Sequence, residues 1–333
     1  MFPINLSSEG FMGLSTIFTR FIWGYISLFS LWILVRLVFF DRFWWLALIN
    51  TVALYIFVPL LLFLPVALFY RRWRCLLGLC FPLGVFLAFY GPLFFPSLPV
   101  ALAQDSRQIT VMSFNMLFAN TDFDEIARMV NANSPDIIGL QEVPENGDKS
   151  LLEKFASTYP YHAFLPIENT HNVGILSRFP IQEVTALPKP LERALQATVL
   201  VDGKPHLQVI VSHLIPNYPM SDAVRLAQDW YDIRAAQASY IANLVQQRKV
   251  PNIMICDCNF TESSETYMLT RKAMHDSFYD VGWGFGHTMT GPFFPVGRLD
   301  YIWYTKELQP IEAYVPSGGG SDHLAVIAKL AIR

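Results

Sequence analysis

Residues 251–260 have the sequence PNIMICDCNF, a short apolar run that ends in a carboxylate and a carboxamide. Pro251 bounds the run, whose length is typical of a buried strand. Asp257 and Asn259 lie two positions apart, so both side chains leave the strand end on the same side. Acceptor oxygens beside an amide suit a hard cation and a phosphate oxygen. The alternative is a capping Asp and a turn Asn, since both are common loop residues.

The same pattern, an apolar strand with a polar residue at its end, recurs along residues 109–323. Each of these polar residues alone has an ordinary explanation as a turn, surface or hydrogen-bonding residue. One catalytic edge, built from the ends of several strands, explains all of them together. The strand-end residues that join Asp257 and Asn259 are Asn115, Glu142, His213 and Asp300, and a final loop adds Asp322 and His323.

The amino-terminal part of the chain is far more apolar than the rest. Three apolar runs extend from Phe21 to Phe40, from Phe43 to Tyr70 and from Cys75 to about Phe95. Each reaches the roughly 20 residues that a helix needs to cross a bilayer. A cleaved signal peptide is too short to explain three runs. We therefore expect three transmembrane helices, integral in a cell membrane.

Arginines indicate how these spans are oriented. Arg71, Arg72 and Arg74 fill the connection between the second and third runs, and Arg20 precedes the first. Positive charge marks cytoplasmic loops, so this connection and the amino terminus are expected in the cytoplasm. Everything after Phe95 is then expected on the other side of the membrane, which makes the carboxyl-terminal domain extracytoplasmic.

The two parts of the chain also differ in charge. Residues 1–104 carry six arginines and two acidic residues, which leaves 18 basic and 25 acidic residues in the remainder, a formal balance of −7. Domains that bind nucleic acids usually concentrate basic charge. The composition therefore disfavours a nucleic acid partner.

The four cysteines give little information. Cys75 and Cys80 fall in or beside the third apolar run, whereas Cys256 and Cys258 flank Asp257. We expect the last two to be too close and wrongly directed for a disulfide with each other. A zinc site at this pair is an alternative, but no second cysteine pair supplies the other ligands.

Residues 105–333 alternate strand-like and helix-like segments, and we place the boundary between two domains, 1–104 and 105–333, near Gln104. A helix capped by Thr121 is expected before Pro135. The longest helical pattern runs from about Ser221 to Gln247. We expect Ile233 and Tyr240 on its apolar face, and Arg234 and Gln237 at positions that do not interrupt the core.

The motifs at the strand ends resemble those of a known family, the endonuclease/exonuclease/phosphatase superfamily. Seven motifs follow in the family's order over most of the chain after Ile109. Their number and order make the resemblance specific. The motifs are SFN at 113–115, GLQE at 139–142, GILSR at 174–178, VSHL at 211–214, CDCNF at 256–260, RLDYI at 298–302 and SDHL at 321–324.

The resemblance implies an α/β fold, a four-layer sandwich of two packed mixed sheets flanked by helices, here preceded by the three transmembrane helices. It also implies a metal site for Mg²⁺, with Mn²⁺ as a substitute. Glu142 would be the principal metal ligand, Asn115 would lie beside it and Asp322 would complete the metal environment. The architecture further resembles membrane-anchored bacterial members similar to the VanJ-type glycopeptide-resistance proteins.

The resemblance assigns catalytic roles to five residues. Asp257 and Asn259 would orient or deprotonate the attacking water and hold the phosphate. His323, paired with Asp300, would bind the phosphoryl group or act as an acid or base, and His213 would hydrogen-bond the phosphate or assist the leaving group. These roles agree with the chemistry, because a phosphate ester repels hydroxide until a cation and fixed donors neutralise it.

One departure and three loops bear on the substrate. Cys256 stands where the family usually has glycine, which puts the local backbone in question. Apolar loops at 214–220, 283–285 and 291–295 are expected near the catalytic edge, either as ordinary packing or as a lipid-facing rim. We expect a membrane-anchored Mg²⁺-dependent phosphohydrolase or phosphodiesterase acting on a lipid phosphate, such as a polyprenyl pyrophosphate or a phospholipid headgroup. The alternatives are an extracytoplasmic nuclease and a catalytically silent membrane scaffold or sensor.

Overall fold

The computed structural model describes residues 8–96, 106–144, 146–165, 172–202, 207–215, 223–247, 250–291 and 294–332. These residues form two compact units, one up to Pro92 and one from Leu93 onward. The boundary expected near Gln104, the start expected near Ser221 for the longest helix and most of the loop at 214–220 lie outside the described residues.

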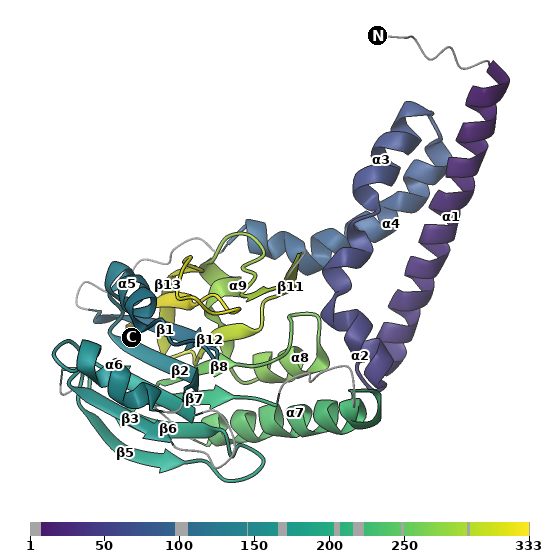
Figure 1. Ribbon diagram of the computed structural model, residues 1–333. Coiled ribbons are helices and arrows are strands. Elements are labelled where there is room, and N and C mark those ends of the chain that lie inside the picture. The colour runs from purple at the N-terminus through teal and green to yellow at the C-terminus, as the bar shows by residue number, and fades with distance from the viewer. Residues whose placement is uncertain are drawn as a thin grey trace. The chain divides into compact units, whose positions relative to one another are not determined.

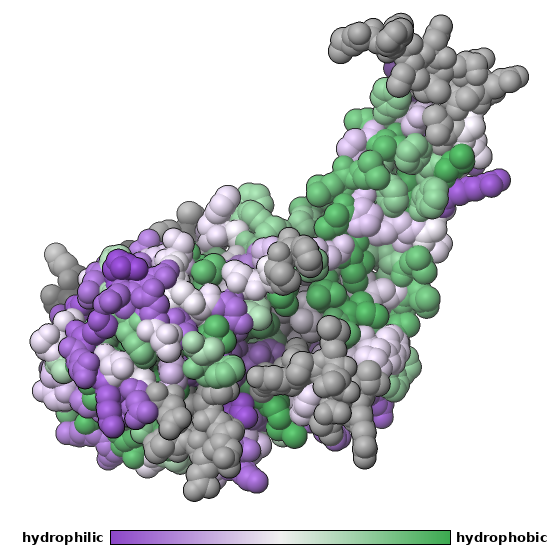
Figure 2. Space-filling view, in the orientation of Figure 1, coloured by the Kyte–Doolittle hydropathy of each residue, from purple (hydrophilic) through white to green (hydrophobic). Residues whose placement is uncertain are grey.

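The amino-terminal unit is helical and apolar. Figure 2 shows hydrophobic residues gathered over its surface, as a helix in contact with lipid requires. The 3-10 helix η2 (Gly91–Phe94) runs across the boundary into the second unit. The other helices are α1 (Ser8–Phe39), α2 (Trp44–Thr51), η1 (Ala53–Phe57), α3 (Leu60–Phe69) and α4 (Trp73–Tyr90).

Two helices of the described chain are long and apolar enough to cross a membrane, at Ser15–Phe39 and Trp73–Phe94. The second of the three expected spans is a bent pair, Trp44–Thr51 and Ala53–Phe69, with an angle of 68° at the break. Val52 leaves helical geometry there, with φ −101° and ψ 23°. The count is therefore three spans if the bent pair crosses once, and two if it does not.

The second unit contains two six-stranded sheets (Figure 1). The first sheet has the strand order β13-β14-β1-β2-β4-β3, and only β1 and β2 in it are parallel. Its strands are β1 (Gln108–Asn115), β2 (Ile137–Val143), β3 (Tyr161–Leu165), β4 (Asn172–Ser177), β13 (Leu308–Tyr314) and β14 (Val326–Ile332).

The second sheet has the order β5-β6-β7-β8-β12-β9, with β7 and β8 as its parallel pair. A separate pair, β10 (Met289–Thr290) with β11 (Pro295–Gly297), stands apart from both sheets. The strands of the second sheet are β5 (Ile181–Ala186), β6 (Ala194–Val199), β7 (Leu207–His213), β8 (Asn252–Asp257), β9 (His275–Asp276) and β12 (Asp300–Tyr304).

Three apolar cores hold four layers together. The largest core lies between the two sheets and joins residues such as Val111 and Ile255. A second core packs the first sheet against α5 (Phe123–Asn133) and α6 (Gly147–Phe155). A third packs the other sheet against α7 (Ala223–Gln246) and α8 (Glu265–Arg271), and the short α9 (Ser277–Val281) follows β9. The four-layer sandwich of two mixed sheets flanked by helices is confirmed.

Two local predictions in this unit are wrong. The cap of α5 is Asp122 instead of Thr121, because the Asp122 carboxylate accepts the amide hydrogen of Glu125 at 2.9 Å. In α7, Arg234 and Gln237 are buried, whereas Ile233 is exposed. The buried face of this helix is thus rotated from the expected one, because two polar side chains find partners beneath it.

Candidate active site

The inward-facing residues of the strands change from apolar to polar at one level of the sandwich. In β8, Ile253 and Ile255 lie in the core between the sheets, and Asp257 is the next inward residue. In β7, Val211 precedes His213 in the same way. The other strands that end the core like this are β1 with Asn115 and β12 with Asp300.

Strand pairing brings these ends together. His213 pairs with Asp257 in the parallel register of β7 and β8, and Asp300 pairs with Asp257 in the antiparallel register of β12 and β8. Asp257 therefore has a charged or titratable neighbour on each side. Two aspartates directly opposite each other repel, so this arrangement requires a compensating positive charge.

Glu142 reaches the site from the opposite sheet through an irregularity in β2. The register with β4 shifts between Leu140 and Val143, and Glu142 has the left-handed φ of +51°. Such an irregularity redirects a side chain at a strand end. The carboxylate of Glu142 accepts the amide hydrogen of Phe118 at 3.3 Å and is partly exposed.

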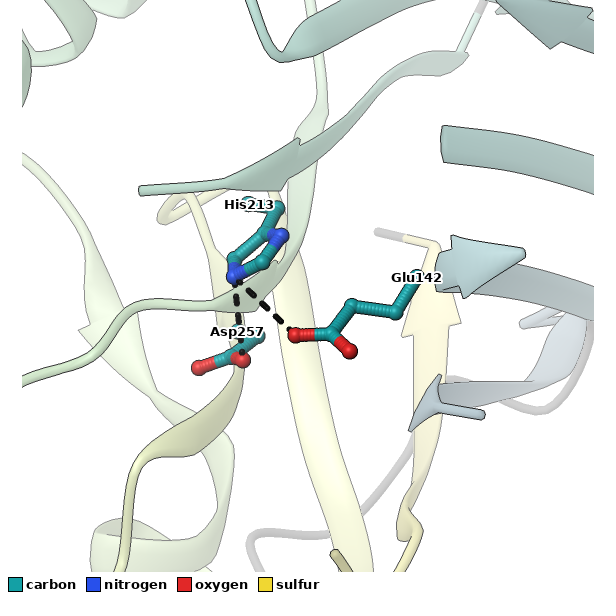
Figure 3. A group of neighbouring side chains, drawn as sticks. All are labelled: Glu142, His213 and Asp257. Atoms are coloured by element: carbon teal, nitrogen blue, oxygen red, sulfur yellow. Dashed lines mark ion pairs between the residues drawn. The ribbon is translucent and has the colours of Figure 1, made fainter. Parts of the chain in front are cut away.

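Glu142, His213 and Asp257 converge from the two sheets (Figure 3). Nε2 of His213 lies 3.8 Å from Oε1 of Glu142 and 3.5 Å from Oδ2 of Asp257. One ligand atom from each of the three residues lies within 4.8 Å of the others. Glu142 and Asp257, which are 115 positions apart in the sequence, thus lie side by side in the fold.

A second group shares Asp257 with the first. It consists of Asp257, Asp300 and His323, whose ligand atoms also lie within 4.8 Å of one another. Nδ1 of His323 is 2.8 Å from Oδ2 of Asp300, and all three residues are buried. The predicted pair of His323 with Asp300 is present, and it adjoins the first group.

The pKa values of Asp257 and His323 are both raised in the folded protein. Burial, and then the charge of Asp300, raises the pKa of Asp257, although His323, His213 and the hydrogen bond from Asn115 oppose this. Burial lowers the pKa of His323, but the charges of Asp300 and Asp257 outweigh it and raise this pKa to about 10. His323 is therefore a cation at neutral pH.

The donor set fits a divalent cation. Mg²⁺ binds oxygen ligands at about 2.1 Å, so two ligands across one ion lie about 4 Å apart, which is compatible with the 4.8 Å within which the ligand atoms of Glu142, His213 and Asp257 lie. Asp257 and Asp300 are wholly buried carboxylates, and Oδ1 of Asp300 has no hydrogen-bond partner among the described residues. Buried carboxylates of like charge are stabilised when a cation lies between them.

The two predicted amide residues are held by hydrogen bonds. Nδ2 of Asn115 donates to Oδ2 of Asp257 at 2.8 Å, and Oδ1 of Asn115 accepts from the amide of Leu117 at 3.0 Å. Nδ2 of Asn259 donates to the carbonyl of Leu214 at 3.0 Å. Both residues therefore lie at the site, and the roles expected of them in metal and phosphate binding stay predictions.

Asp322 is half-buried at the border of the site. Its carboxylate accepts from the hydroxyl of Ser321 at 3.3 Å, and it belongs to neither of the two groups that the described His, Cys, Asp and Glu residues form. Its charge contributes to the raised pKa of His323. Its predicted role as a metal ligand stays a prediction.

Sequence reasoning missed one residue that fixes Asp300. Oγ1 of Thr288 is buried and accepts the amide hydrogens of Leu299 and Asp300 at 2.9 and 3.1 Å. A threonine in a loop 12 residues before an aspartate gives no sequence signal for this contact. Only the fold brings the two segments together.

The expectation for the cysteines is wrong. Cys256 and Cys258 form a disulfide with their Cα atoms 5.1 Å apart, which lies in the range that a disulfide requires. Residues i and i+2 of a strand face the same side, and the turn to the left-handed Asn259, with φ +52°, begins directly after them. The zinc alternative is wrong for the same reason, because paired cysteines offer no thiolates.

We expect Asp300→Asn to move the alkaline limb of the pH–rate profile toward lower pH. The charge of Asp300 keeps His323 protonated up to a pKa of about 10, and without it this pKa falls toward the ordinary 6.5. Protonated His323 contributes to the free energy of unfolding, fully below about pH 6.5, and this contribution is lost as pH rises through about 10. In Asp300→Asn the contribution is smaller, so less stability is lost over this pH range. The measurement is kcat/KM for a soluble phosphate diester from pH 6 to 10.

Asp322→Asn is the control for this prediction. Asp322 is the smallest of the contributions that raise the pKa of His323, so its removal shifts the limb less. Equal shifts in both variants would contradict a special role for the pair of Asp300 with His323.

Solved structures similar to this chain share its fold. An endonuclease/exonuclease/phosphatase from Beutenbergia cavernae has a TM-score of 0.56 at 23% identity, and the alignment covers 68% of this chain and 72% of that one. An AP endonuclease from Archaeoglobus fulgidus has a TM-score of 0.55 at 15% identity, covering 66% and 98%. A beta toxin from Staphylococcus aureus has a TM-score of 0.50 at 16% identity, covering 66% and 99%.

No curated protein matches the sequence significantly. The resemblance to VanJ-type proteins therefore stays a prediction. The profile of the Endonuclease/Exonuclease/phosphatase family, in contrast, matches residues 112–323, more than half of the chain. This range begins in β1, ends at His323 and encloses both groups of acidic residues and histidines. The chain therefore belongs to the endonuclease/exonuclease/phosphatase family of metal-dependent phosphoesterases.

Proposed function

We propose that this enzyme is a Mg²⁺-dependent hydrolase of a phosphate-bearing lipid in the membrane that anchors it. A polyprenyl pyrophosphate or a phospholipid headgroup has the required chemistry. The observation that carries the proposal is the packing of the residues at which the chain leaves its last candidate span. The ring of Phe94 contacts those of Trp283 and Phe285, with centroids 5.7 and 5.1 Å apart, and the amide of Gly284 donates to the carbonyl of Leu93 at 2.8 Å.

The segment that begins with this contact continues directly into the active site. Met289 forms an antiparallel bridge with His323, and the amide and hydroxyl of Thr290 both donate to the carbonyl of Asp322, at 2.9 and 2.8 Å. From Trp283 to Met289 the chain advances six residues, which extend over at most about 20 Å. We infer that a substrate anchored in the same bilayer can reach the site, because the covalent tether raises its effective concentration.

Exposed aromatic residues support a bilayer as the neighbour of this segment. Trp283 is 72% exposed, Phe95 is 82% exposed and Phe294 is 53% exposed. Large exposed apolar side chains mark interaction surfaces, and tryptophan favours the membrane–water interface. Trp283 and Phe294 come from the two loops, 283–285 and 291–295, that we expected at the catalytic edge, and Phe95 directly follows the last candidate span.

The residues of the site have distinct tasks in hydrolysis. Glu142 and the neighbouring carboxylates would hold a divalent cation, which would supply positive charge to polarise the phosphoryl group. Asp257 orients a water molecule and accepts its proton, which its raised pKa favours. The protonated His323, held by Asp300, donates to the phosphoryl oxygens as negative charge develops there. His213, between the two sheets, donates to the phosphate or to the leaving oxygen.

We place the catalytic unit outside the cytoplasm. The arginine-rich connection at residues 71–74 favours this orientation, and the disulfide between Cys256 and Cys258 favours an oxidising compartment. A cytosolic glutathione pool would keep two cysteines beside a catalytic carboxylate reduced.

Alkylation of the cysteines tests this placement. We expect a thiol reagent to label Cys75 and Cys80, which are free, when protein from membranes is denatured without reductant, and to label Cys256 and Cys258 only after reduction. Mass spectrometry of the labelled peptides is the measurement. Labelling of all four cysteines before reduction would contradict both the disulfide and the extracytoplasmic placement.

The substrate is tested with the full-length protein in vesicles. We expect Mg²⁺-dependent release of phosphate or headgroup from vesicles that contain polyprenyl pyrophosphate or phospholipid, and no nicking of supercoiled plasmid. Trp283→Ala with Phe285→Ala should lower hydrolysis in vesicles and leave hydrolysis of a soluble diester unchanged. Val184→Ser, an exposed apolar residue of β5, is the matched control. Plasmid nicking without lipid hydrolysis would identify a nuclease, and inactivity on all phosphate esters would indicate a silent scaffold.

A further inference from the structure

Two polar side chains of α7 lie buried on the face that packs against the catalytic sheet. Arg234 is 1% exposed and Gln237 is 4% exposed. They are three residues apart, so they are neighbours on one face of the helix, and Ile241 continues this face into the apolar core. Burial of a charged group costs free energy unless its partners replace the lost hydration. The partners of Arg234 therefore indicate what it does.

Arg234 connects the segments that follow two neighbouring catalytic strands. Its Nη1 donates to the carbonyl oxygen of Asn259 at 2.5 Å and to that of Ile215 at 3.2 Å. Ile215 lies two residues after His213, and Asn259 lies two residues after Asp257. One guanidinium group, whose planar donors have a fixed geometry, thus binds both segments at matching positions.

Gln237 and Asn259 complete the connection. Oε1 of Gln237 accepts the amide hydrogen of Ile215 at 3.1 Å, and its Nε2 donates to the carbonyl of Pro190 at 2.8 Å. Both backbone polar groups of Ile215 are therefore bonded to α7. The side chain of Asn259 closes the contact between the two segments with its hydrogen bond to Leu214.

The backbone of Asn259 depends on such support. Its φ of +52° is uncommon for a residue other than glycine and persists only where the surroundings determine it. In this conformation its amide donates to Oδ1 of Asp257 at 3.2 Å. A change of the Asn259 backbone would withdraw that donor and release the carboxylate that faces His213.

We propose that Arg234 and Gln237 are positioning residues for hydrolysis. They fix the spacing of His213 and Asp257 by holding the segments behind them to one rigid helix. They act through the backbone of Ile215 and Asn259, so they affect the turnover of any phosphate ester. The inference rests on the phosphoesterase activity and is independent of the lipid substrate.

The test compares Arg234→Met with a control of similar structural cost. Methionine keeps most of the apolar volume and removes the donors, and Ile241→Ala creates a cavity on the same face of α7 while leaving the hydrogen bonds of Arg234 and Gln237 to both segments in place. With bis(p-nitrophenyl) phosphate and the full-length protein, we expect kcat of Arg234→Met to fall about 100-fold, because small misplacements of reacting groups have effects of this size. KM and the Mg²⁺ concentration for half-maximal activity should change by less than about threefold.

A conservative variant and chemical rescue separate positioning from folding. Arg234→Lys should retain more activity than Arg234→Met, and free guanidinium should restore part of the activity of Arg234→Ala. Ile241→Ala should keep the kcat of the parent protein despite a lower Tm. Equal kcat losses in Ile241→Ala and Arg234→Met, or an unchanged kcat in a folded Arg234→Met, would overturn the proposal.

Hydrogen exchange provides a measurement that needs no substrate. In Gln237→Leu and Arg234→Met, the amides of peptides covering residues 211–215 and 256–260 should exchange faster than in the parent protein, with other strands unchanged. Unchanged exchange in these peptides would overturn the proposal that Arg234 and Gln237 hold the two segments in place. If exchange is faster in the variants but the parent protein hydrolyses no phosphate ester, the holding role of Arg234 and Gln237 is supported and the phosphoesterase activity is contradicted.

Discussion

Glu142→Gln is expected to lower Mg²⁺-dependent hydrolysis of a phosphate diester about 1000-fold. The substitution keeps the size of the side chain and its hydrogen bond from Phe118, but it removes the only described carboxylate that the first sheet contributes to the two groups at the site. A bound cation contributes several kcal/mol of transition-state stabilisation, and each 1.4 kcal/mol corresponds to a factor of ten. The measurement is kcat/KM as a function of Mg²⁺ concentration.

Glu183→Gln is a close control for this variant. Glu183 is also a glutamate with a φ of +51° at an irregular position of a strand, but it lies on exposed β5, where it accepts from the hydroxyl of Thr198 at 3.1 Å. We expect its activity and Mg²⁺ dependence to match those of the parent protein. Equal losses of kcat/KM in Glu142→Gln and Glu183→Gln would show that the effect comes from the backbone. They would contradict the assignment of Glu142 as a metal ligand.

Asp257→Asn is expected to lower activity at least about 100-fold while leaving the free energy of unfolding equal or higher. Loss of the group that accepts the proton costs about 100-fold or more in rate. Burial and Asp300 raise the pKa of Asp257, so its ionised form destabilises the metal-free fold at neutral pH. Stability from this group is greatest below its ordinary pKa and falls as pH rises through its folded-state pKa. Asp257→Asn should not show this loss of stability with rising pH. The measurement is thermal unfolding of both proteins between pH 4 and 8, with a chelator present to remove metal ions.

Asp276→Asn is the contrasting buried aspartate. Asp276 binds Arg298 at 2.7 Å and accepts from the hydroxyl of Tyr267 at 2.9 Å, away from the two groups of the site. Breaking a buried ion pair leaves an uncompensated charge and costs about 3–5 kcal/mol. Asp276→Asn should therefore unfold at lower temperature, and a stabilised Asp276→Asn together with a destabilised Asp257→Asn would refute this account of the charges.

Strands with strong apolar patterns could be predicted from the sequence, and weakly patterned elements could not. β1, β2, β7, β8 and β14 are short runs rich in apolar residues, a pattern that indicates buried strands. β5 is mostly exposed, and β9 is only two residues long, so neither has an apolar period that sequence reasoning could detect. The bend at Val52 was missed because an apolar run of sufficient length predicts a span whether or not the helix breaks.

The site could be predicted to the level of residue type, and its geometry could not. Polar residues at the ends of apolar strands identified Glu142 and Asp257 as candidates, and the polar loop before the last strand identified His323. The register that sets Asp257 opposite Asp300, and the irregularity that turns Glu142 inward, depend on pairing between distant segments. Arg234 was misassigned because a helical period alone does not say which polar residue has a buried partner.

Each sheet supplies only part of the site, with Glu142 and Asn115 on one side and His213, Asp257 and Asp300 on the other. A metal ion bound by residues of both sheets would stabilise the packing of one sheet on the other. Metal binding would then raise the free energy of unfolding, and folding would be required for metal binding. We expect partly folded chains, in which the two sheets have not yet packed together, to lack a complete metal site. We therefore expect hydrolytic activity only in chains in which the two sheets have packed together and completed the site.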